Sequence, residues 1–243
     1  SLVYPGILGS KLFLLLLIMD YKQLFKLRKV YSTKDGHSIY HLNFKSRYEM
    51  AMFFLRYQEY YESINPEFRG QNFYLLDYIS WYVEYTGKMM FTYPKDFIGY
   101  NLPSDSIKEC SLGIPEGDKN KYDWMMNKLW CDLHIESNGK FYIIGTIRKD
   151  ATYQHEIAHA LYYLEPEYRK SMDMITGHLP EKFRRSMYNI LATIYADKVF
   201  KDETQAYMAT DSYMTGMNEI PGFKTHVKKY EKVFKRWYPK IAI

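Results

Sequence analysis

Two histidines stand four residues apart, at positions 155 and 159, and a glutamate directly follows the first. In a helix, residues four apart lie one above the other on the same face. Both imidazole rings can therefore aim a nitrogen at one point about 2.0–2.1 Å away, the distance that zinc prefers from histidine. Glu156 projects beside that point, where its carboxylate can accept a proton from a metal-bound water. The spacing thus predicts that His155 and His159 bind zinc and that Glu156 is a general base.

The pattern is rare, and its surroundings suit it. With 7 histidines in the chain, chance predicts about 0.01 occurrences of this motif. Residues 141–147 are rich in β-forming side chains and predict a strand, and residues 148–150 form a short connection. Asp150 or Thr152 can then cap a helix that runs to Leu164. Residues 152–164 resemble the metal-binding helix of the zincin metallopeptidases.

A catalytic zinc site normally has three protein ligands and a water, so a third ligand is needed. Residues 181–200 follow helical spacing, and we expect this helix to continue to Tyr207. Glu203 would then share a side with small residues, which allows a close approach to the metal helix. In gluzincins, the third ligand is a glutamate on a helix downstream of the two histidines. The resemblance therefore implies Glu203 as the ligand, with Asp202 holding one histidine ring in its metal-binding tautomer.

Two other residues are candidates for the third ligand. Glu165 stands six residues after the second histidine, where metzincins place their ligand, but Tyr162 occupies the position at which those proteins need a glycine to turn the chain. His178 lies beside Gly177 in an apparent loop and could swing toward the metal. A lone loop histidine is more often exposed to solvent, so Glu203 remains the prediction.

The resemblance implies a zinc-dependent metallopeptidase that acts on a peptide or protein substrate. A donor is also needed to stabilise the oxyanion that forms during hydrolysis. Tyr207 lies one turn after Glu203 and is the chosen candidate, with Tyr213 and His178 as alternatives. The rival hypothesis is a noncatalytic zincin-like module that uses the metal for stability while binding or regulating a partner. A fourth protein ligand at the metal would favour that module, whereas an open position would favour the enzyme.

Composition is that of a globular protein of 243 residues, with 47% hydrophobic and 25% charged residues. The net charge of +5 is concentrated in residues 222–240, which carry seven basic residues against Glu231. The remainder of the chain is close to neutral, so we expect no nucleic-acid partner. Cys110 and Cys131 do not form a metal-binding pattern, and the sequence is compatible with either free thiols or a disulfide between them.

The chain begins with an apolar run, Leu12 to Met19. It is too short to span a bilayer and lacks a cleavage site of the signal-peptide type. We interpret residues 1–20 as a leader or a packed segment. Membrane contact through this run is not favoured, and a cytoplasmic location is preferred over a secreted one. Residues 21–243 are expected to form a single domain, which could divide into an upper part, 21–165, and a helical lower part, 166–243.

Periodicity and turn signals predict the remaining elements. Helices are expected at residues 48–62, 73–85, 122–132 and 223–238, the last with its lysines facing outward. Residues 93–104 and 108–121, rich in glycine and proline, are expected to be loops. Asn138-Gly139 between two apolar runs predicts a β-hairpin over residues 134–147. The expected fold is α+β and mostly helical, with a small antiparallel sheet beside the metal helix, as in zincins.

Overall fold

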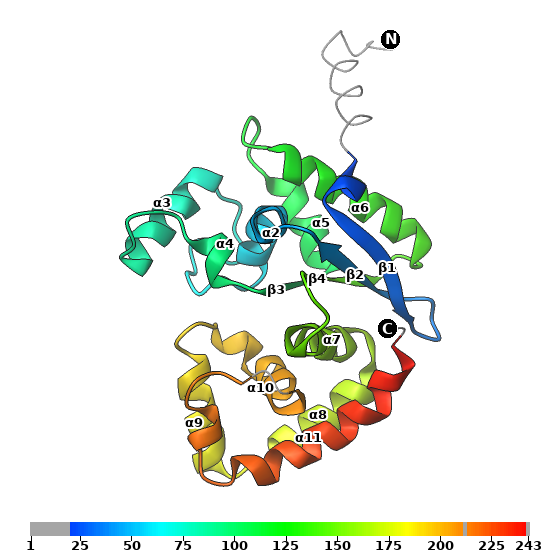
Figure 1. The fold of residues 1–243 in the computed structure, drawn as a ribbon, viewed down its shortest axis with the longest axis vertical. Coiled ribbons are helices and arrows are strands. Elements are labelled where there is room, and N and C mark those ends of the chain that lie inside the picture. The colour runs from blue at the N-terminus through cyan, green and yellow to red at the C-terminus, as the bar shows by residue number, and fades with distance from the viewer. Residues whose placement is uncertain (1–19, 211–212, 242–243) are drawn as a thin grey trace.

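The computed structural model describes residues 20–210 and 213–241 (Figure 1). The apolar run of residues 12–19, and with it nearly all of the segment predicted as a leader, lies outside the described residues. Within the described ranges, no helix is both long enough and apolar enough to cross a membrane.

A four-stranded sheet crosses the middle of the molecule in the order β1-β2-β4-β3 (Figure 1). Its strands are β1 (Phe25–Ser32), β2 (Ser38–Phe44), β3 (Gly99–Pro103) and β4 (Phe141–Thr146). The pairs β1–β2 and β3–β4 are antiparallel, whereas β2–β4 is parallel. The α+β, mostly helical fold is thus confirmed, but the sheet is mixed and not purely antiparallel. The parallel pair arises because the chain between β2 and β4 passes through the helices above the sheet.

Strand β4 separates two hydrophobic cores. Successive side chains of a strand point to opposite faces, and Phe141 and Ile143 belong to the core above the sheet, while Tyr142 and Ile144 belong to the core below. All six residues of β4 are buried, as expected of a strand that is covered on both faces. Helix α7 (Ala151–Leu164), which carries the predicted metal ligands His155 and His159, packs in the lower core. The sheet therefore forms the roof above α7.

The helices above the sheet are α2, α3, α4, α5 and α6 (Figure 1). Helix α2 (Arg47–Glu62) confirms the prediction for residues 48–62, and its N-cap Ser46 accepts a hydrogen bond from the backbone N–H of Glu49. Helix α3 (Leu75–Thr86) begins two residues later than predicted and ends, as expected, at Gly87, whose φ of 61° lies in the left-handed region. Helix α6 (Lys121–Glu136) is longer than the predicted helix 122–132.

The predicted hairpin at residues 134–147 is wrong. Residues 134–136 form the last turn of α6, and only the β4 part of that segment is a strand. Asn138 and Gly139 have φ values of 50° and 85°, and the Gly139 N–H donates to the His134 carbonyl at 3.0 Å. Asn-Gly here ends a helix with left-handed residues, a task it suits as well as it suits a hairpin turn. Within residues 20–210 and 213–241, the strands that form a hairpin are β1 and β2, which were not predicted from the sequence.

Two predicted loops are also partly wrong. Residues 93–104 contain the short helix α4 (Tyr93–Asp96) and strand β3. Residues 108–113 belong to α5 (Ser104–Gly113), which buries Ile107 and Cys110. Gly99, Pro103 and Gly113 lie at the ends of these elements, whereas Pro115 and Gly117 lie in the connection between α5 and α6. Pro103, for example, is the last residue of β3 and the N-cap position of α5.

The lower half consists of α7, α8 (Pro166–Gly177), α9 (Glu181–Leu191), α10 (Phe200–Ala209) and α11 (Phe223–Trp237). The single helix predicted over 181–207 is wrong, because α9 ends at Leu191 and Ala196 is extended, with a ψ of 151°. The apolar residues keep their helical spacing across residues 192–199, so the spacing does not indicate the break. Short 3-10 helices lie at Tyr21–Gln23, Asp197–Val199, Met217–Glu219 and Tyr238–Lys240.

Helix α11 is amphipathic, as predicted. It buries Phe223, Val227, Tyr230 and Phe234 against the lower core and leaves its lysines exposed. The two cysteines do not pair: Cys110 is buried and Cys131 is exposed, both as free thiols.

Candidate metal centre

Helix α7 is fixed at its start by a side-chain cap and along its length by burial. The Asp150 carboxylate accepts a hydrogen bond from the Thr152 N–H at 3.0 Å, so Asp150, one of the two predicted capping residues, is the N-cap. The strand β4 feeds into the helix through residues 147–150. His155, Glu156 and His159 are 6%, 5% and 3% exposed. Three polar side chains on one buried helix face require partners, and the surrounding structure supplies them.

The two histidines and Glu203 converge on one point. The Nε2 atoms of His155 and His159 are 3.1 Å apart. Nε2 of His155 is 3.6 Å from Oε2 of Glu203, and Nε2 of His159 is 3.6 Å from the other oxygen, Oε1. Glu203 is 2% exposed. Tetrahedral ligands about 2.05 Å from a zinc ion lie about 3.3 Å from one another. The observed spacings therefore fit three ligands of one ion, and the predicted residues are brought together.

Neighbouring groups orient these ligands for a metal. The Asp202 carboxylate lies 2.9 Å from Nδ1 of His159, which places the ring proton on Nδ1 and leaves the Nε2 lone pair directed at the cluster. Burial lowers the pKa of His159, but the Asp202 and Glu203 carboxylates outweigh it and hold the pKa well above its usual value. Oε2 of Glu203 is buried and has no hydrogen-bond partner. A divalent ion would satisfy that oxygen and offset the local negative charge.

Glu156 is held beside the cluster by the sheet. Its Oε2 accepts a hydrogen bond from the Asn101 amide at 2.7 Å, and the Tyr142 hydroxyl donates to the Asn101 side-chain oxygen. Burial raises the pKa of Glu156 above its usual value, while His155, His159 and Asn101 oppose the shift. A carboxylate with a raised pKa is better suited to receive a proton and release it.

Strand β3 reaches the metal helix because it begins with glycine. A Cβ atom on Gly99 would lie 2.4 Å from Oε1 of Glu156 and 2.5 Å from Cγ2 of Thr152. No larger residue fits there without displacing the proposed base. The same strand carries Asn101, so β3 both approaches Glu156 and binds it.

Helix α10 brings Tyr207 to the site together with Glu203. The Tyr207 ring lies 4.4 Å from the His155 ring, centre to centre, and its hydroxyl is 3.0 Å from the Tyr195 hydroxyl. Burial, and then Glu203, raise the pKa of Tyr207 well above its usual value. Both tyrosines line the same cleft as the histidines. Tyr207 therefore stays protonated and can act as a hydrogen-bond donor there.

The other candidates lie elsewhere. Glu165 ends α7 and accepts a hydrogen bond from the Tyr31 hydroxyl at 2.6 Å. His178 is exposed at the end of α8, with Nδ1 2.7 Å from the Met174 carbonyl oxygen. Tyr213 packs against Phe223 with ring centres 5.1 Å apart. Neither alternative ligand belongs to the cluster, which within the described part of the chain consists of His155, His159 and Glu203.

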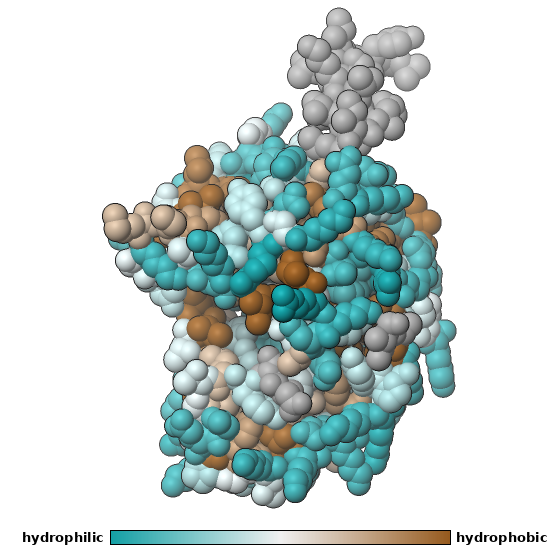
Figure 2. All heavy atoms as spheres, in the orientation of Figure 1, coloured by the Kyte–Doolittle hydropathy of each residue, from teal (hydrophilic) through white to brown (hydrophobic). Residues whose placement is uncertain are grey.

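The cluster opens into a cleft of about 430 Å³ between the upper and lower halves. Its walls come from the end of α2, from α3, from residues 96–101, from α7 and from residues 194–207. Figure 2 shows the outline of the molecule notched between the two halves, with hydrophobic side chains gathered above the notch. The volume is within the range of small-molecule and peptide side-chain sites.

Sequence reasoning missed several residues of this cleft: Gly99, Asn101, Tyr195 and Glu62. Gly99 and Asn101 lay in a segment interpreted as a loop, and an alternation of small and apolar residues from 99 to 103 was the available signal. Tyr195 was placed inside a continuous helix. Glu62 comes from α2, about a hundred residues before the histidines, and nothing local connects the two.

Comparison of the chain with protein-family models, with curated proteins and with solved structures gave no match.

Proposed function

We propose that this protein is a zinc-dependent hydrolase, and more specifically a metallopeptidase. The observation that supports it best is the set of spacings of 3.1, 3.6 and 3.6 Å among ligand atoms of His155, His159 and Glu203, with Glu156 beside them in an open cleft. Zinc bound at such a site acidifies a coordinated water and polarises a substrate carbonyl. The resemblance of residues 152–164 to the zincin metal helix agrees with this proposal.

Each residue then has a task. Glu156 accepts the proton of the attacking water and transfers it to the leaving amine nitrogen. Asn101 holds the carboxylate of Glu156 in place through the 2.7 Å hydrogen bond. Tyr207, with its hydroxyl proton retained, donates to the oxyanion that develops at the carbonyl carbon.

Strand β3 is suited to hold an extended substrate. It pairs with β4 on one side and stands at the edge of the sheet, and Gly99 and Asn101 line the cleft. An extended peptide can add to such an edge through backbone hydrogen bonds. In this proposal β3, and not the predicted 134–147 hairpin, is the sheet edge that holds the substrate beside α7.

Metal analysis and peptide cleavage test the proposal together. Purified protein should contain close to one zinc per chain and should cleave an unstructured protein such as casein. His159→Ala and Glu203→Ala should lose the metal, and Glu156→Gln should keep it while losing hydrolysis by a factor of about 10²–10⁴. Full zinc retention in Glu203→Ala would reject the ligand set. Unchanged turnover in Glu156→Gln would reject the mechanism.

A further inference from the structure

The cleft around the metal centre is acidic although the chain as a whole is basic. Of the described residues that line it, Glu59, Glu62, Asp96, Glu156 and Glu203 are acidic, and none is lysine or arginine. The net charge of the chain is +5. Carboxylates gathered in a hollow without basic residues produce a focused negative potential, which attracts cations.

Most of these carboxylates have an assigned partner. Asp96 is 2.9 Å from the Lys88 ammonium and accepts from the Tyr82 hydroxyl. Glu59 accepts from the Tyr93 hydroxyl at 2.8 Å. Glu156 is bound by the Asn101 amide, and Glu203 is a ligand of the proposed metal.

Glu62 differs from Glu59, Glu156 and Glu203 in its exposure, because it is half-buried and they are buried. Like Glu59 and Glu156 it has a neutral partner, the amide of Gln58 one turn earlier on α2, and no ion pair to it is found among the described residues. The nearby Lys198 donates instead to the backbone carbonyl of Tyr61 at 2.7 Å. Burial, followed by the carboxylates of Glu203 and Glu156, raises the pKa of Glu62 well above its usual value, with His159 opposing.

Zinc alone does not balance this charge. Its two positive charges would offset two of the carboxylates of Glu59, Glu62, Glu156 and Glu203, and the raised pKa values of Glu59, Glu62 and Glu156 reflect the cost of ionising all of them together. A half-buried carboxylate that keeps access to solvent, as Glu62 does, gains free energy when a further cation approaches.

The cleft that Glu62 lines also has an aromatic wall. Tyr78, Trp81, Tyr82, Tyr85 and Phe97 line the cleft, and the Trp81 and Tyr85 rings are stacked with centres 4.9 Å apart. Aromatic faces attract ammonium and guanidinium groups and cover the aliphatic stems of lysine and arginine. Acid and aromatic wall together form a site for a cation that carries an apolar arm.

We propose that Glu62 and this aromatic wall bind a cationic nitrogen group of the substrate, within the cleft where the proposed hydrolysis occurs. The group is either the α-ammonium of a peptide or the side chain of a lysine or arginine. That the cation belongs to a substrate rests on the proposed function. Binding of the cation itself can be measured without turnover.

Four small amides separate the two sources of charge. Lysine amide, norleucine amide and their Nα-acetyl forms differ only in the side-chain ammonium and the α-ammonium. The amides are titrated calorimetrically into the zinc-loaded protein at 0.15 M salt, where the attraction of exposed surface charges is largely screened. Under these conditions one cationic amide should bind at least tenfold more tightly than acetyl-norleucine amide. The member of the set that gains affinity identifies the cation. Equal affinity of all four amides would overturn the proposal.

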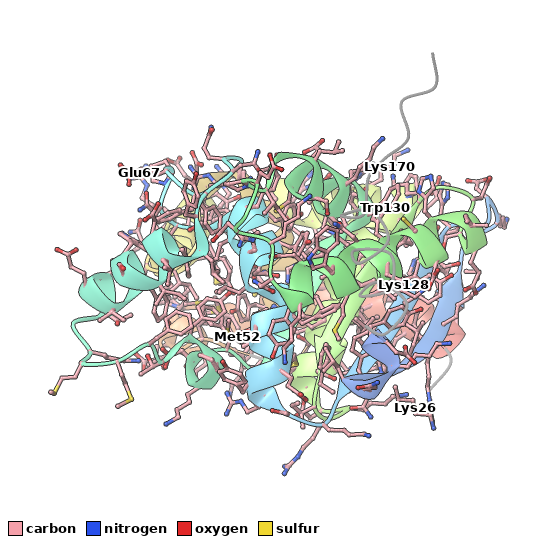
Figure 3. All side chains as sticks on the ribbon, turned by 90° about the horizontal axis from the view of Figure 1, so that it is seen from above. Lys26, Met52, Glu67, Lys128, Trp130 and Lys170 are labelled. Atoms are coloured by element: carbon pink, nitrogen blue, oxygen red, sulfur yellow. The ribbon has the colours of Figure 1, made fainter. Side chains whose placement is uncertain are left out.

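Two matched variants complete the test. Glu62→Gln should keep its zinc but lose the preference for the cation, whereas Glu67→Gln, an exposed residue at the rim of the molecule in Figure 3, should keep the preference. A preference that survives in Glu62→Gln would overturn the assignment of this residue. The same amide series built into peptide substrates then distinguishes failures: a cation preference without any cleavage would reject the peptidase and leave the cation site standing.

Discussion

Two clusters of buried and half-buried acids in this molecule differ in whether an arginine lies among them. Above the sheet, Asp118 and Asp123 surround the guanidinium of Arg56, with contacts of 2.8 and 3.2 Å. The same guanidinium donates to the carbonyls of Phe73 and Asp118. In the cleft, Glu62, Glu156 and Glu203 face one another without a lysine or arginine among the described lining residues.

The difference indicates which cluster serves stability and which serves binding. Arg56 is supplied by the chain itself, so its cluster is complete once the protein folds. The described residues lining the cleft include no lysine or arginine, and His159, whose pKa the carboxylates raise, is the group that can offset part of their charge. A buried acidic cluster that relies on a histidine and lacks a permanent cation therefore indicates a site for ions or charged substrates.

The largest effect is expected when the internal cation is removed. Arg56→Met leaves the carboxylates of Asp118 and Asp123 without a cation, with only backbone N–H donors remaining, and should lower the free energy of unfolding by about 3–5 kcal/mol. Chemical denaturation measures this change. Arg185→Met is the matched control, because Arg185 pairs with Glu181 on the exposed surface and its loss should leave stability nearly unchanged. Equal stability of both variants would remove the distinction between the clusters.

A third buried ionisable group, His41, stays in its neutral form. His41 bonds Thr146 through Nε2 at 2.9 Å, and burial lowers its pKa from 6.5 to about 4. The unfolded chain then binds a proton more readily than the folded chain between these values. Stability should therefore fall as pH drops from 6.5 to 4, by about 3 kcal/mol from this residue.

Comparison with His41→Gln isolates that contribution. Denaturation of both proteins at pH 7 and at pH 4 should show a smaller loss for the variant, because all other groups titrate alike in the two. An identical loss in both would show that His41 is not the titrating group.

Chelation tests the external cation directly. With free zinc at about 100 times its dissociation constant, binding stabilises the folded protein by about 2.7 kcal/mol, and EDTA should remove that amount. Thermal unfolding measures the change. Glu203→Gln should not respond to EDTA, because it lacks the third ligand. An EDTA response of Glu203→Gln equal to that of the parent would contradict this account.

The smallest effect concerns the group that orients His159. Asp202→Ala should weaken zinc binding by about 10–100-fold, because the Nδ1 proton loses its acceptor at 2.9 Å. Competition with a zinc-sensitive dye measures the affinity. Asp197→Ala, on the exposed surface of the preceding 3-10 helix, should retain parental affinity. Loss of affinity in both variants would indicate a general effect of negative charge.

The sequence revealed the parts of the site that depend on local geometry. Four-residue spacing places His155 and His159 on one helix face wherever the helix lies, so their convergence could be predicted. Glu203 was assigned correctly to the cluster although the helix leading to it was drawn as continuous. Residues 192–199 interrupt that helix without disturbing its apolar periodicity, so the break could not be recognised from spacing.

The remaining parts depend on contacts between distant segments. Asn101 and Glu62 reach the site only because the sheet and α2 are stacked over α7, and no pattern within either segment indicates this. Asn138-Gly139 was read as a hairpin because the same two residues, with the same left-handed backbone, can end a helix. Such ambiguities are resolved by which neighbouring segment buries the adjacent apolar residues.

The contact between Gly99 and Glu156 has one further consequence. A peptide paired with the outer side of β3 would take its register from the five residues of that strand. The same strand holds Glu156, the proposed proton acceptor, through Asn101. The scissile bond and the carboxylate of Glu156 would then both be positioned by β3, and a movement of β3 would displace both together.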